Sequence, residues 1–303
     1  MEFKNIIGNT EVKDYLAKSI NQQNILHSYL FVGTSGIGKL IIAKEFAKNI
    51  LCLENTKEET CTCKSCTCFN GNNHPDFYCI NENGESIKVE TIRELTEKVI
   101  EKPIVSDKKV YIINDCEKMT KEAQNCLLKT LEEPPEFVVI ILISSNENLI
   151  LNTIKSRCMS VKFHNIDDDE LLKYALENLG YNEVSKNLLK SFDGSIGKAI
   201  KLKDFKEKYD EIDLLISNLN QKDIIDIMIE GKIIYDKENI YDILDYIIVC
   251  LYEKLNENEK YIDCIKYVNK CATRLRSNSN FDMSIDNLLF EMWEEINEIS
   301  NRS

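Results

Sequence analysis

The sequence predicts an α/β domain built on a parallel sheet, followed by a region made only of helices. Three observations support this fold class. Apolar, strand-like runs alternate with helix-patterned segments up to about residue 165. The continuous apolar run Phe137–Ile143 has the length and character of a central parallel strand buried on both faces. From about Asp167 onward, the apolar residues recur only at helical spacing.

The first elements alternate from helix to strand. Residues 10–20 place apolar side chains on one helical face, the run Tyr29–Val32 predicts a strand, and Leu40–Leu53 is again helical in pattern. A short strand is expected at Phe77–Ile80. The remaining expected elements are a helix at Thr91–Glu101, a strand at Lys109–Ile113, a helix at Lys121–Glu133 that stops at two prolines, the strand Phe137–Ile143 and a helix-like segment at Leu149–Lys155.

The second part of the chain is helical. Asp167 with Glu170 is typical of an N-cap pair, Asp193-Gly194 marks a turn, and Gly197-Lys198 begins another helix. Five more helices are expected in the regions 206–219, 221–231, 237–255, 259–276 and 284–299. The chain of 303 residues is long enough for three domains, at 1–165, 166–205 and 206–303.

Composition excludes some function classes. The formal net charge of −13 argues against a protein that coats nucleic acid by bulk electrostatics. The longest apolar run is too short to cross a bilayer, and the first residues lack the basic and apolar pattern of a signal peptide. We therefore expect a cytoplasmic protein with no membrane partner, in which thiols stay reduced.

A phosphate-binding loop follows the first predicted strand. It consists of Gly33, Thr34, Ser35, Gly36, Ile37, Gly38 and Lys39. Its glycines let the backbone turn N–H groups toward a phosphate, and Lys39 is positioned to reach the outer phosphates. The next residue is normally Ser or Thr, whose hydroxyl ligates Mg²⁺, but here it is Leu40. The loop is therefore built to hold phosphate but lacks an oxygen needed for hydrolysis.

The end of the strand Lys109–Ile113 is where such proteins carry a second Mg²⁺ contact, an Asp followed by a catalytic carboxylate. Here the two positions hold Asn114 and Asp115. An amide is a poorer ligand for a hard cation than a carboxylate. A shift of one residue would make Asp115 the ligand, so both readings stay open.

Five of the twelve cysteines fall between Cys52 and Cys68. In a reducing compartment this clustering favours metal over disulfides. Cys63 and Cys66 form a C-x2-C pair, and Cys52 with Cys61 makes the natural second pair. Cys68 could take the place of Cys61. Four thiolates would close the coordination sphere of Zn²⁺, so the site would be structural. The alternative is a loop of unliganded thiols.

Other polar residues are less informative alone. Arg157, in Ser156-Arg157-Cys158, reads as a solvated charge after a helix, and Lys198 is equally unremarkable. His74-Pro75-Asp76 reads as a turn rather than a ligand set. The sequence contains no nucleophile signature for hydrolytic catalysis.

Together these segments resemble the bacterial DNA polymerase III clamp loader, an AAA+ assembly. The resemblance extends with specific motifs to about residue 205, and beyond that it rests on length and helical character. The motifs are His27-Ser28-Tyr29-Leu30-Phe31, the phosphate loop, the cysteine insertion, His74-Pro75-Asp76, the run Leu127-Leu128-Lys129-Thr130-Leu131-Glu132-Glu133-Pro134-Pro135, and Ser156-Arg157-Cys158.

Two kinds of chain in that family carry a zinc insertion. The motor subunit (tau/gamma) has an intact loop and an Asp-Glu strand end, whereas the delta-prime subunit has degenerate versions and acts as a stator. Leu40 and Asn114 make this chain resemble the delta-prime kind. The alternative is a motor that hydrolyses ATP with imperfect Mg²⁺ ligation. The resemblance leaves ATP or ADP binding open and implies little hydrolysis.

The resemblance also assigns roles. Arg157 matches the arginine finger that acts on the ATP site of a neighbouring motor subunit, and Lys198 falls where a sensor-2 arginine is usual. The matching zinc ligands are Cys52, Cys61, Cys63 and Cys66, with one residue fewer than usual between the second and the third. Residues 1–165 would be the AAA+ domain with the insertion at about 52–68, 166–205 the lid and 206–303 the collar. The implied partners are the motor and delta subunits in a hetero-pentamer, the β sliding clamp and, through the complex, primed DNA.

Overall fold

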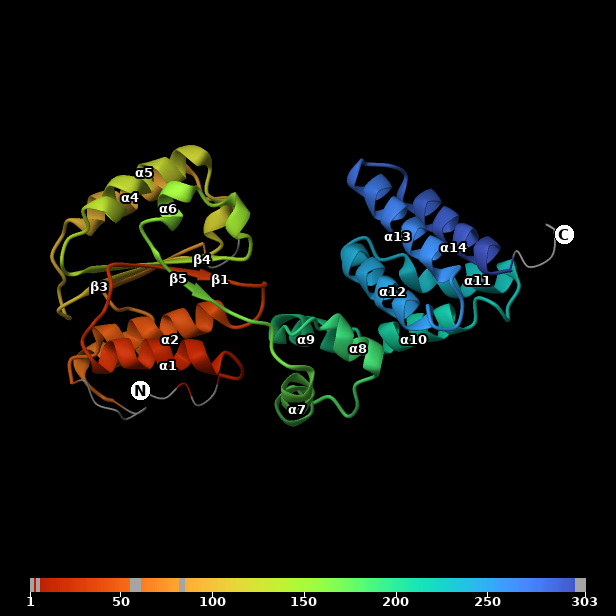
Figure 1. Cartoon of the computed structure of the whole chain (residues 1–303), viewed down its shortest axis with the longest axis horizontal. Coiled ribbons are helices and arrows are strands. Elements are labelled where there is room, and N and C mark those ends of the chain that lie inside the picture. The colour runs from red at the N-terminus through yellow and green to blue at the C-terminus, as the bar shows by residue number, and fades with distance from the viewer. Residues whose placement is uncertain (1–2, 4–5, 55–60, 82–84, 298–303) are drawn as a thin grey trace. The chain divides into compact units, whose positions relative to one another are not determined.

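The computed structural model describes residue 3 and residues 6–54, 61–81 and 85–297. The chain divides into two compact units. Met1–Leu171 together with Gly194–Gly197 forms the first, and Leu172–Asp193 together with Lys198–Ser303 forms the second. The first unit contains the sheet, and the second is helical (Figure 1).

The first unit is organised around a five-stranded sheet in the order β2-β3-β4-β1-β5, with every neighbouring pair parallel. The two strands between β2 and β1, which are β3 and β4, are buried along their whole length, as expected of continuous apolar runs in a parallel sheet. The strands are β1 (Ser28–Val32), β2 (Phe77–Ile80), β3 (Lys109–Ile113), β4 (Val138–Ser144) and β5 (Met159–Lys162).

Helices cover both faces of this sheet. On one face α1 (Thr10–Asn21) and α2 (Lys39–Leu51) pack on alternate strand residues such as Phe31. On the other face α4 (Val89–Val99), α5 (Lys121–Glu132) and α6 (Asn152–Lys155) pack on the intervening residues such as Leu30. Figure 1 shows these two helical layers on opposite sides of the strands. The apolar spacing of each helix therefore accounts for the predicted α/β fold.

Three details differ from the sequence-based expectation. A helix, α3 (Lys64–Asn70), lies within the cysteine segment. The segment expected as one helix at Leu149–Lys155 is split into a 3₁₀ turn at Glu147–Leu149 and the short α6, because the backbone of Ile150 between them is extended. Glu170, expected to complete an N-cap pair with Asp167, instead accepts a hydrogen bond from the Gly8 backbone N–H.

The carboxyl-terminal half is helical, as predicted. The buried faces of α12 (Ile240–Lys254), α13 (Tyr261–Arg276) and α14 (Phe281–Asn297) contribute much of its core. Gly231 packs closely there, because a Cβ on it would lie 2.3 Å from the Leu289 side chain. None of the helices in the described ranges is both long and apolar enough to span a bilayer. The helices are α7 (Asp168–Asn178), α8 (Lys186–Ser191), α9 (Ile196–Lys203), α10 (Lys206–Ser217), α11 (Ile224–Glu230), α12 (Ile240–Lys254), α13 (Tyr261–Arg276) and α14 (Phe281–Asn297).

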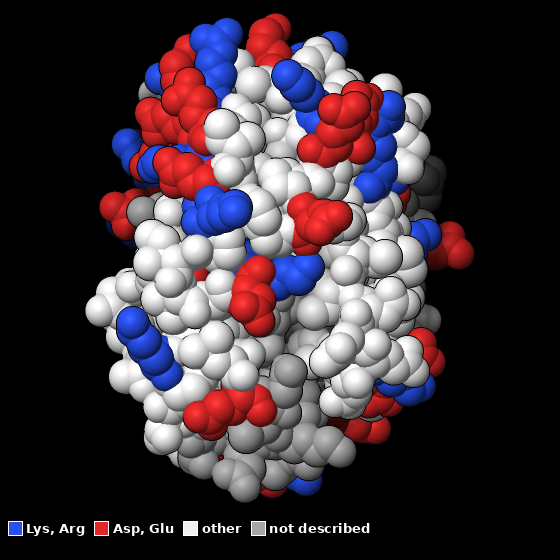
Figure 2. Space-filling view, turned by 90° about the vertical axis from the view of Figure 1, so that its left-hand side faces the viewer, with Lys and Arg blue, Asp and Glu red and all other residues white. Residues whose placement is uncertain are grey.

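Charged side chains of both signs are interspersed on the face of the first unit seen in Figure 2. They gather toward its upper end, and the lower part is mostly uncharged where it is described. This mixture matches the acidic composition of the chain, and that face offers no extended basic surface on which a nucleic acid backbone would bind by charge alone.

Candidate functional site

The phosphate loop connects the end of β1 to the start of α2. Gly38 caps α2 with a φ of 91°, and Gly36 has a φ of 77°, both in the left-handed region that glycine adopts without strain. A Cβ on Gly36 would lie 2.3 Å from the Ser195 hydroxyl, and the Gly36 carbonyl accepts a hydrogen bond from Gly197 N–H at 2.9 Å. The loop conformation is therefore fixed by its glycines and by the segment 194–197 of the same unit.

Lys39 lies inside this loop. Its ammonium donates to the carbonyl oxygens of Gly33 and Thr34, both at 2.6 Å, and the side chain is buried. Burial lowers the Lys39 pKa, and the nearby carboxylates of Glu117 and Asp115 oppose that effect. A cation held in this way is positioned for a phosphate, which would replace the loop carbonyls as its partner.

Neither of the two expected Mg²⁺ positions, Leu40 and Asn114, carries a hydroxyl or a carboxylate. Leu40 lies in the first turn of α2 and packs against the apolar core. The Asn114 amide donates to the Asn81 carbonyl at 3.3 Å, and the Asn81 amide returns a bond of 3.2 Å to the Asn114 carbonyl. Asp115 forms an ion pair with Lys118 at 3.1 Å. Asn114 is thus used to join the ends of two strands.

Glu117 is a polar residue of this edge that sequence reasoning missed. Its Oε1 accepts hydrogen bonds from the backbone and hydroxyl of Ser145. Its Oε2 is buried and has no hydrogen-bond partner among the described residues. Burial raises its pKa, but the hydrogen bonds from Ser145 act against burial, and the pKa of Glu117 is lowered overall, so the group stays charged. The sequence did contain a sign of it, because Glu117 is a carboxylate two residues after Asp115, just beyond the carboxyl end of a predicted parallel strand.

The cysteine insertion brings four thiols together. The Sγ atoms of Cys52, Cys61, Cys63 and Cys66 all lie within 4.8 Å of one another, and this group could hold a metal ion. A tetrahedral ion with metal–sulfur bonds of about 2.3 Å separates its sulfurs by roughly 3.8 Å, so the donor set and spacing fit Zn²⁺. Cys68, the possible substitute, lies outside this group.

Local structure positions these thiols. Cys52 ends α2, Cys63 caps α3, and Cys66 lies in the first turn of α3. Burial raises the pKa of Cys63, but hydrogen bonds from the Cys66 and Leu53 backbones outweigh it and lower the pKa to about 7. The first thiolate is therefore accessible near neutral pH, whereas burial raises the pKa of Cys52 and Cys66 in the absence of metal.

Arg157 lies at the amino edge of the sheet, where the parallel strands begin. The phosphate loop lies at the carboxyl edge, where the strands end. Arg157 precedes β5, and its carbonyl accepts a bond from the Ser28 hydroxyl at the start of β1, whereas the loop follows the end of β1. Because β1 and β5 are parallel, the length of β1, roughly 16 Å, separates the two features. The guanidinium pairs with Glu132 at 2.6 Å and donates to the Thr153 carbonyl at 2.9 Å. About a third of its side chain (34%) is exposed.

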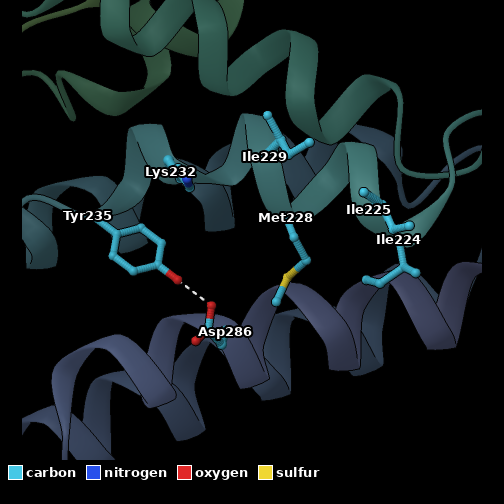
Figure 3. Close-up of a pocket in the computed structure, with 7 residues that line it drawn as sticks. All are labelled: Ile224, Ile225, Met228, Ile229, Lys232, Tyr235 and Asp286. Carbon is cyan, nitrogen blue, oxygen red and sulfur yellow. Dashed lines mark hydrogen bonds between the residues drawn. The ribbon is translucent and has the colours of Figure 1, made fainter.

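Lys198 belongs to the second unit, where its ammonium lies 3.3 Å from the Asp193 carboxylate. The structure thus brings Lys39, Asp115 and the loop glycines together in the first unit and leaves Lys198 in the other. The second unit also contains an apolar pocket of about 540 Å³ between α11 and α14 (Figure 3). Ile225, Met228 and Ile229 line it, and Tyr235 donates a hydrogen bond to Asp286 at one end.

Known proteins resemble this chain in sequence. The family model described as "DNA polymerase III, delta subunit" matches residues 8–167, which is more than half of the chain. "DNA polymerase III subunit delta'" of Bacillus subtilis is 32% identical over 214 residues, covering 70% of this chain and 65% of that protein. "DNA polymerase III subunit tau/gamma" of Haemophilus influenzae is 32% identical over 209 residues, covering 67% of this chain but only 30% of that protein.

A solved structure resembles it in fold. The crystal structure of a DNA polymerase III gamma subunit-related protein from Thermotoga maritima matches with a TM-score of 0.53 and 18% identity, covering 93% of this chain and 99% of that one. This likeness concerns the fold alone, and with the parallel sheet it confirms the predicted fold class, an α/β domain followed by helices. On the evidence of the matching family model, the chain belongs to the family described as DNA polymerase III, delta subunit.

Proposed function

We propose that this chain is a delta-prime-type subunit of a DNA polymerase III clamp loader. It acts as a stator that does not hydrolyse ATP and supplies Arg157 to the ATP site of a neighbouring motor subunit. One observation carries the proposal: the exposed Arg157 and the phosphate loop lie at opposite edges of the same sheet. A finger at the amino edge is directed away from its own loop, so it acts on another subunit.

The phosphate loop supports the part of the proposal that concerns hydrolysis. Phosphoryl transfer needs a Mg²⁺ ion held by a loop hydroxyl and a strand-end Asp. Here those positions are Leu40, which is partly buried against the core, and Asn114, which is bonded to Asn81. Lys39 and the loop N–H groups suffice to hold a phosphate, so bound nucleotide would be retained without turnover.

The surroundings of Arg157 suit a finger. Glu132 and Thr153 hold the guanidinium at the surface, where its donors are available to an incoming phosphate. A γ-phosphate carries more charge than one carboxylate and would compete for Arg157 when the subunits assemble. In GTPases, an arginine finger raises the rate by about 10³–10⁵-fold.

We propose that the four cysteines hold one structural Zn²⁺. Four thiolates leave no open position for water, so the ion would supply folding energy rather than catalysis. The partners would be the motor (tau/gamma) and delta subunits in a hetero-pentamer, which opens the β sliding clamp and loads it on primed DNA. In this proposal residues 1–165 form the AAA+ domain, 166–205 the lid with Lys198 as its sensor, and 206–303 the collar.

The test is Arg157→Ala in a reconstituted clamp loader, with Arg93→Ala as the matched control. Arg93 is an exposed arginine on α4 of the same unit. We expect Arg157→Ala to abolish turnover at the one ATP site that it contacts and to lower DNA-stimulated ATPase and clamp loading, while assembly stays intact. Arg93→Ala should behave like wild type. Unchanged clamp loading in Arg157→Ala would reject the finger assignment.

A second candidate is an ATP-hydrolysing motor subunit of the same loader. The similarity to a tau/gamma protein and the complete Gly33–Lys39 loop favour it. Leu40→Ser discriminates the two, because a chain that already ligates Mg²⁺ gains nothing from a new hydroxyl. An unchanged, high ATPase rate in both forms would favour the motor.

A further inference from the structure

Four buried polar residues meet beneath the cysteine insertion. They are Ser65 on α3, His74 and Asp76 just before β2, and Ser106 before β3. Buried polar groups lower stability unless their hydrogen bonds are satisfied, so a cluster of this kind has to be connected throughout. A simple turn at His74-Pro75-Asp76, as the sequence predicts, does not require these side chains to be buried together.

The hydrogen-bond directions in the cluster can be assigned. The Asp76 backbone N–H donates to His74 Nδ1 at 3.0 Å, so Nδ1 carries no proton. The neutral ring then has its proton on Nε2 and donates to the Ser65 hydroxyl at 2.8 Å. Ser65 in turn donates to the Leu51 carbonyl at 2.7 Å. Burial lowers the His74 pKa, which agrees with a neutral ring.

A second branch reaches the same carbonyl. The Ser106 hydroxyl also donates to the Leu51 carbonyl at 2.7 Å. The Asp76 carboxylate fixes this branch, because it accepts backbone N–H bonds from Ile104, Val105 and Ser106 at 2.6, 2.7 and 2.9 Å. Both branches therefore converge on the last residue of α2.

The two anchor points adjoin the thiols. Leu51 immediately precedes Cys52, and Ser65 immediately precedes Cys66. The network thus holds the backbone on both sides of the four-cysteine group, although His74 itself contributes no free nitrogen for a metal, since both ring nitrogens are engaged.

We propose that His74 is a positioning residue for the metal centre. Acting through Ser65 and the Leu51 carbonyl, it preassembles the Cys52 and Cys66 sulfurs before the ion binds. The inference rests on the proposed zinc site and adds the residues that tune its affinity. Outer partners of this kind typically change metal affinity by about 10–100-fold.

Two substitutions separate the roles of the ring nitrogens. His74→Asn keeps an acceptor near Nδ1 for the Asp76 N–H but removes the donor to Ser65, whereas His74→Gln places an amide donor near Nε2. His164→Asn is the matched control, because His164 is exposed in the same unit and exchanges hydrogen bonds with the Asn9 side chain through its backbone. Should His74→Asn fail to fold, Ser65→Ala removes the same link by losing one hydroxyl.

The measurements are zinc affinity, by competition with a chromophoric chelator, and the thiolate-to-Co²⁺ absorption of the cobalt-substituted protein. We expect His74→Asn or Ser65→Ala to weaken zinc binding by about 10–100-fold and to alter the cobalt spectrum, with His74→Gln closer to wild type and His164→Asn identical to it. Wild-type affinity and spectrum in all variants would overturn the positioning role alone. A wild-type chain that takes up neither ion would overturn the metal site and the inference with it.

Discussion

The carboxyl and amino edges of the sheet carry different functional side chains. At the carboxyl edge, the phosphate loop and Lys39 are in place, but Leu40 and Asn114 are committed to packing and to a strand-end hydrogen bond. At the amino edge, an exposed arginine lies in the short segment between α6 and β5. Ligands of open α/β sheets bind at the carboxyl edge. The difference is what the proposed stator role requires: a loop that holds phosphate without Mg²⁺ ligands at one edge, and an arginine accessible to another chain at the other.

Buried carboxylates show the same contrast. Asp76, at the amino edge, accepts three backbone hydrogen bonds, whereas Glu117, at the carboxyl edge, has one oxygen without a partner among the described residues. The amino edge is therefore satisfied as structure, and the carboxyl edge retains an unused polar atom of the kind expected beside a ligand site.

Metal removal should have the largest effect on stability, because the ion would hold together the four cysteines of the insertion at the amino edge. At a free zinc concentration of roughly 1,000 times Kd, a bound ion stabilises the fold by about 4 kcal/mol. Metal analysis of protein purified under reducing conditions should give about one zinc per chain. Cys63→Ser should lose it and unfold earlier in urea, whereas Cys68→Ser, outside the four-cysteine group, should retain it. Full stability after chelation would contradict the site.

Asp76→Asn should have the next largest effect on stability. It replaces a buried charged acceptor of three N–H groups, and we expect a loss of about 3 kcal/mol in the free energy of unfolding. Burial raises the Asp76 pKa, but the three backbone bonds outweigh it and lower the pKa overall. Its stabilisation is therefore complete above the unfolded pKa of about 3.9 and is lost as the pH falls through the lower folded value.

Acid titration checks this assignment. In urea melts between neutral pH and pH 2, the difference between wild type and Asp76→Asn should shrink only below about pH 4. Asp107→Asn, an exposed carboxylate nearby in sequence, is the control and should change little. A constant difference down to pH 2 would mean that Asp76 acts through packing rather than charge.

Glu117→Gln should lower the free energy of unfolding by less, about 1 kcal/mol. The variant keeps one acceptor for the Ser145 N–H and places an amide nitrogen where the unpartnered oxygen was. The urea midpoint measures it. Since the Glu117 carboxylate opposes the effect of burial on Lys39, the pKa of Lys39 should also fall further in the variant. A loss as large as that of Asp76→Asn would remove the contrast between the edges.

Glu132→Ala should have the smallest effect on stability, below about 1 kcal/mol, because both side chains of its pair with Arg157 are partly exposed to solvent. Freed from that carboxylate, Arg157 should serve the neighbouring site better, raising loader ATPase by at most about fivefold. Glu133→Ala is the control on the adjacent position. A fall in ATPase would show that Glu132 orients Arg157 rather than competing for it.

Much of the sheet was predictable from local pattern. The strands Phe77–Ile80 and Lys109–Ile113 have the predicted bounds, since continuous apolar runs of this length suit a sheet covered on both faces. The helix Lys64–Asn70 was not predicted, because its polar and cysteine-rich residues show no apolar periodicity and its start depends on the Cys63 thiol as cap.

The candidate sites were predictable in part. Spacing identified the loop residues and the Cys63–Cys66 pair but left Cys68 open in place of Cys61, and the family resemblance was needed to name the four cysteines that the fold brings together. Glu117 and the His74 cluster were not accessible, because their partners are distant in sequence: Ser145 lies 28 residues from Glu117, and Ser106 lies 32 from His74. Only the folded sheet makes such pairs neighbours.

The central claim is tested most directly by ATP hydrolysis of the purified chain alone, with Mg²⁺ and primed DNA present. The stator account predicts no turnover above background, in wild type and in Lys39→Ala alike. Clear turnover in wild type that Lys39→Ala abolishes would contradict it, and would mean that the carboxyl edge is a working ATPase site despite Leu40 and Asn114.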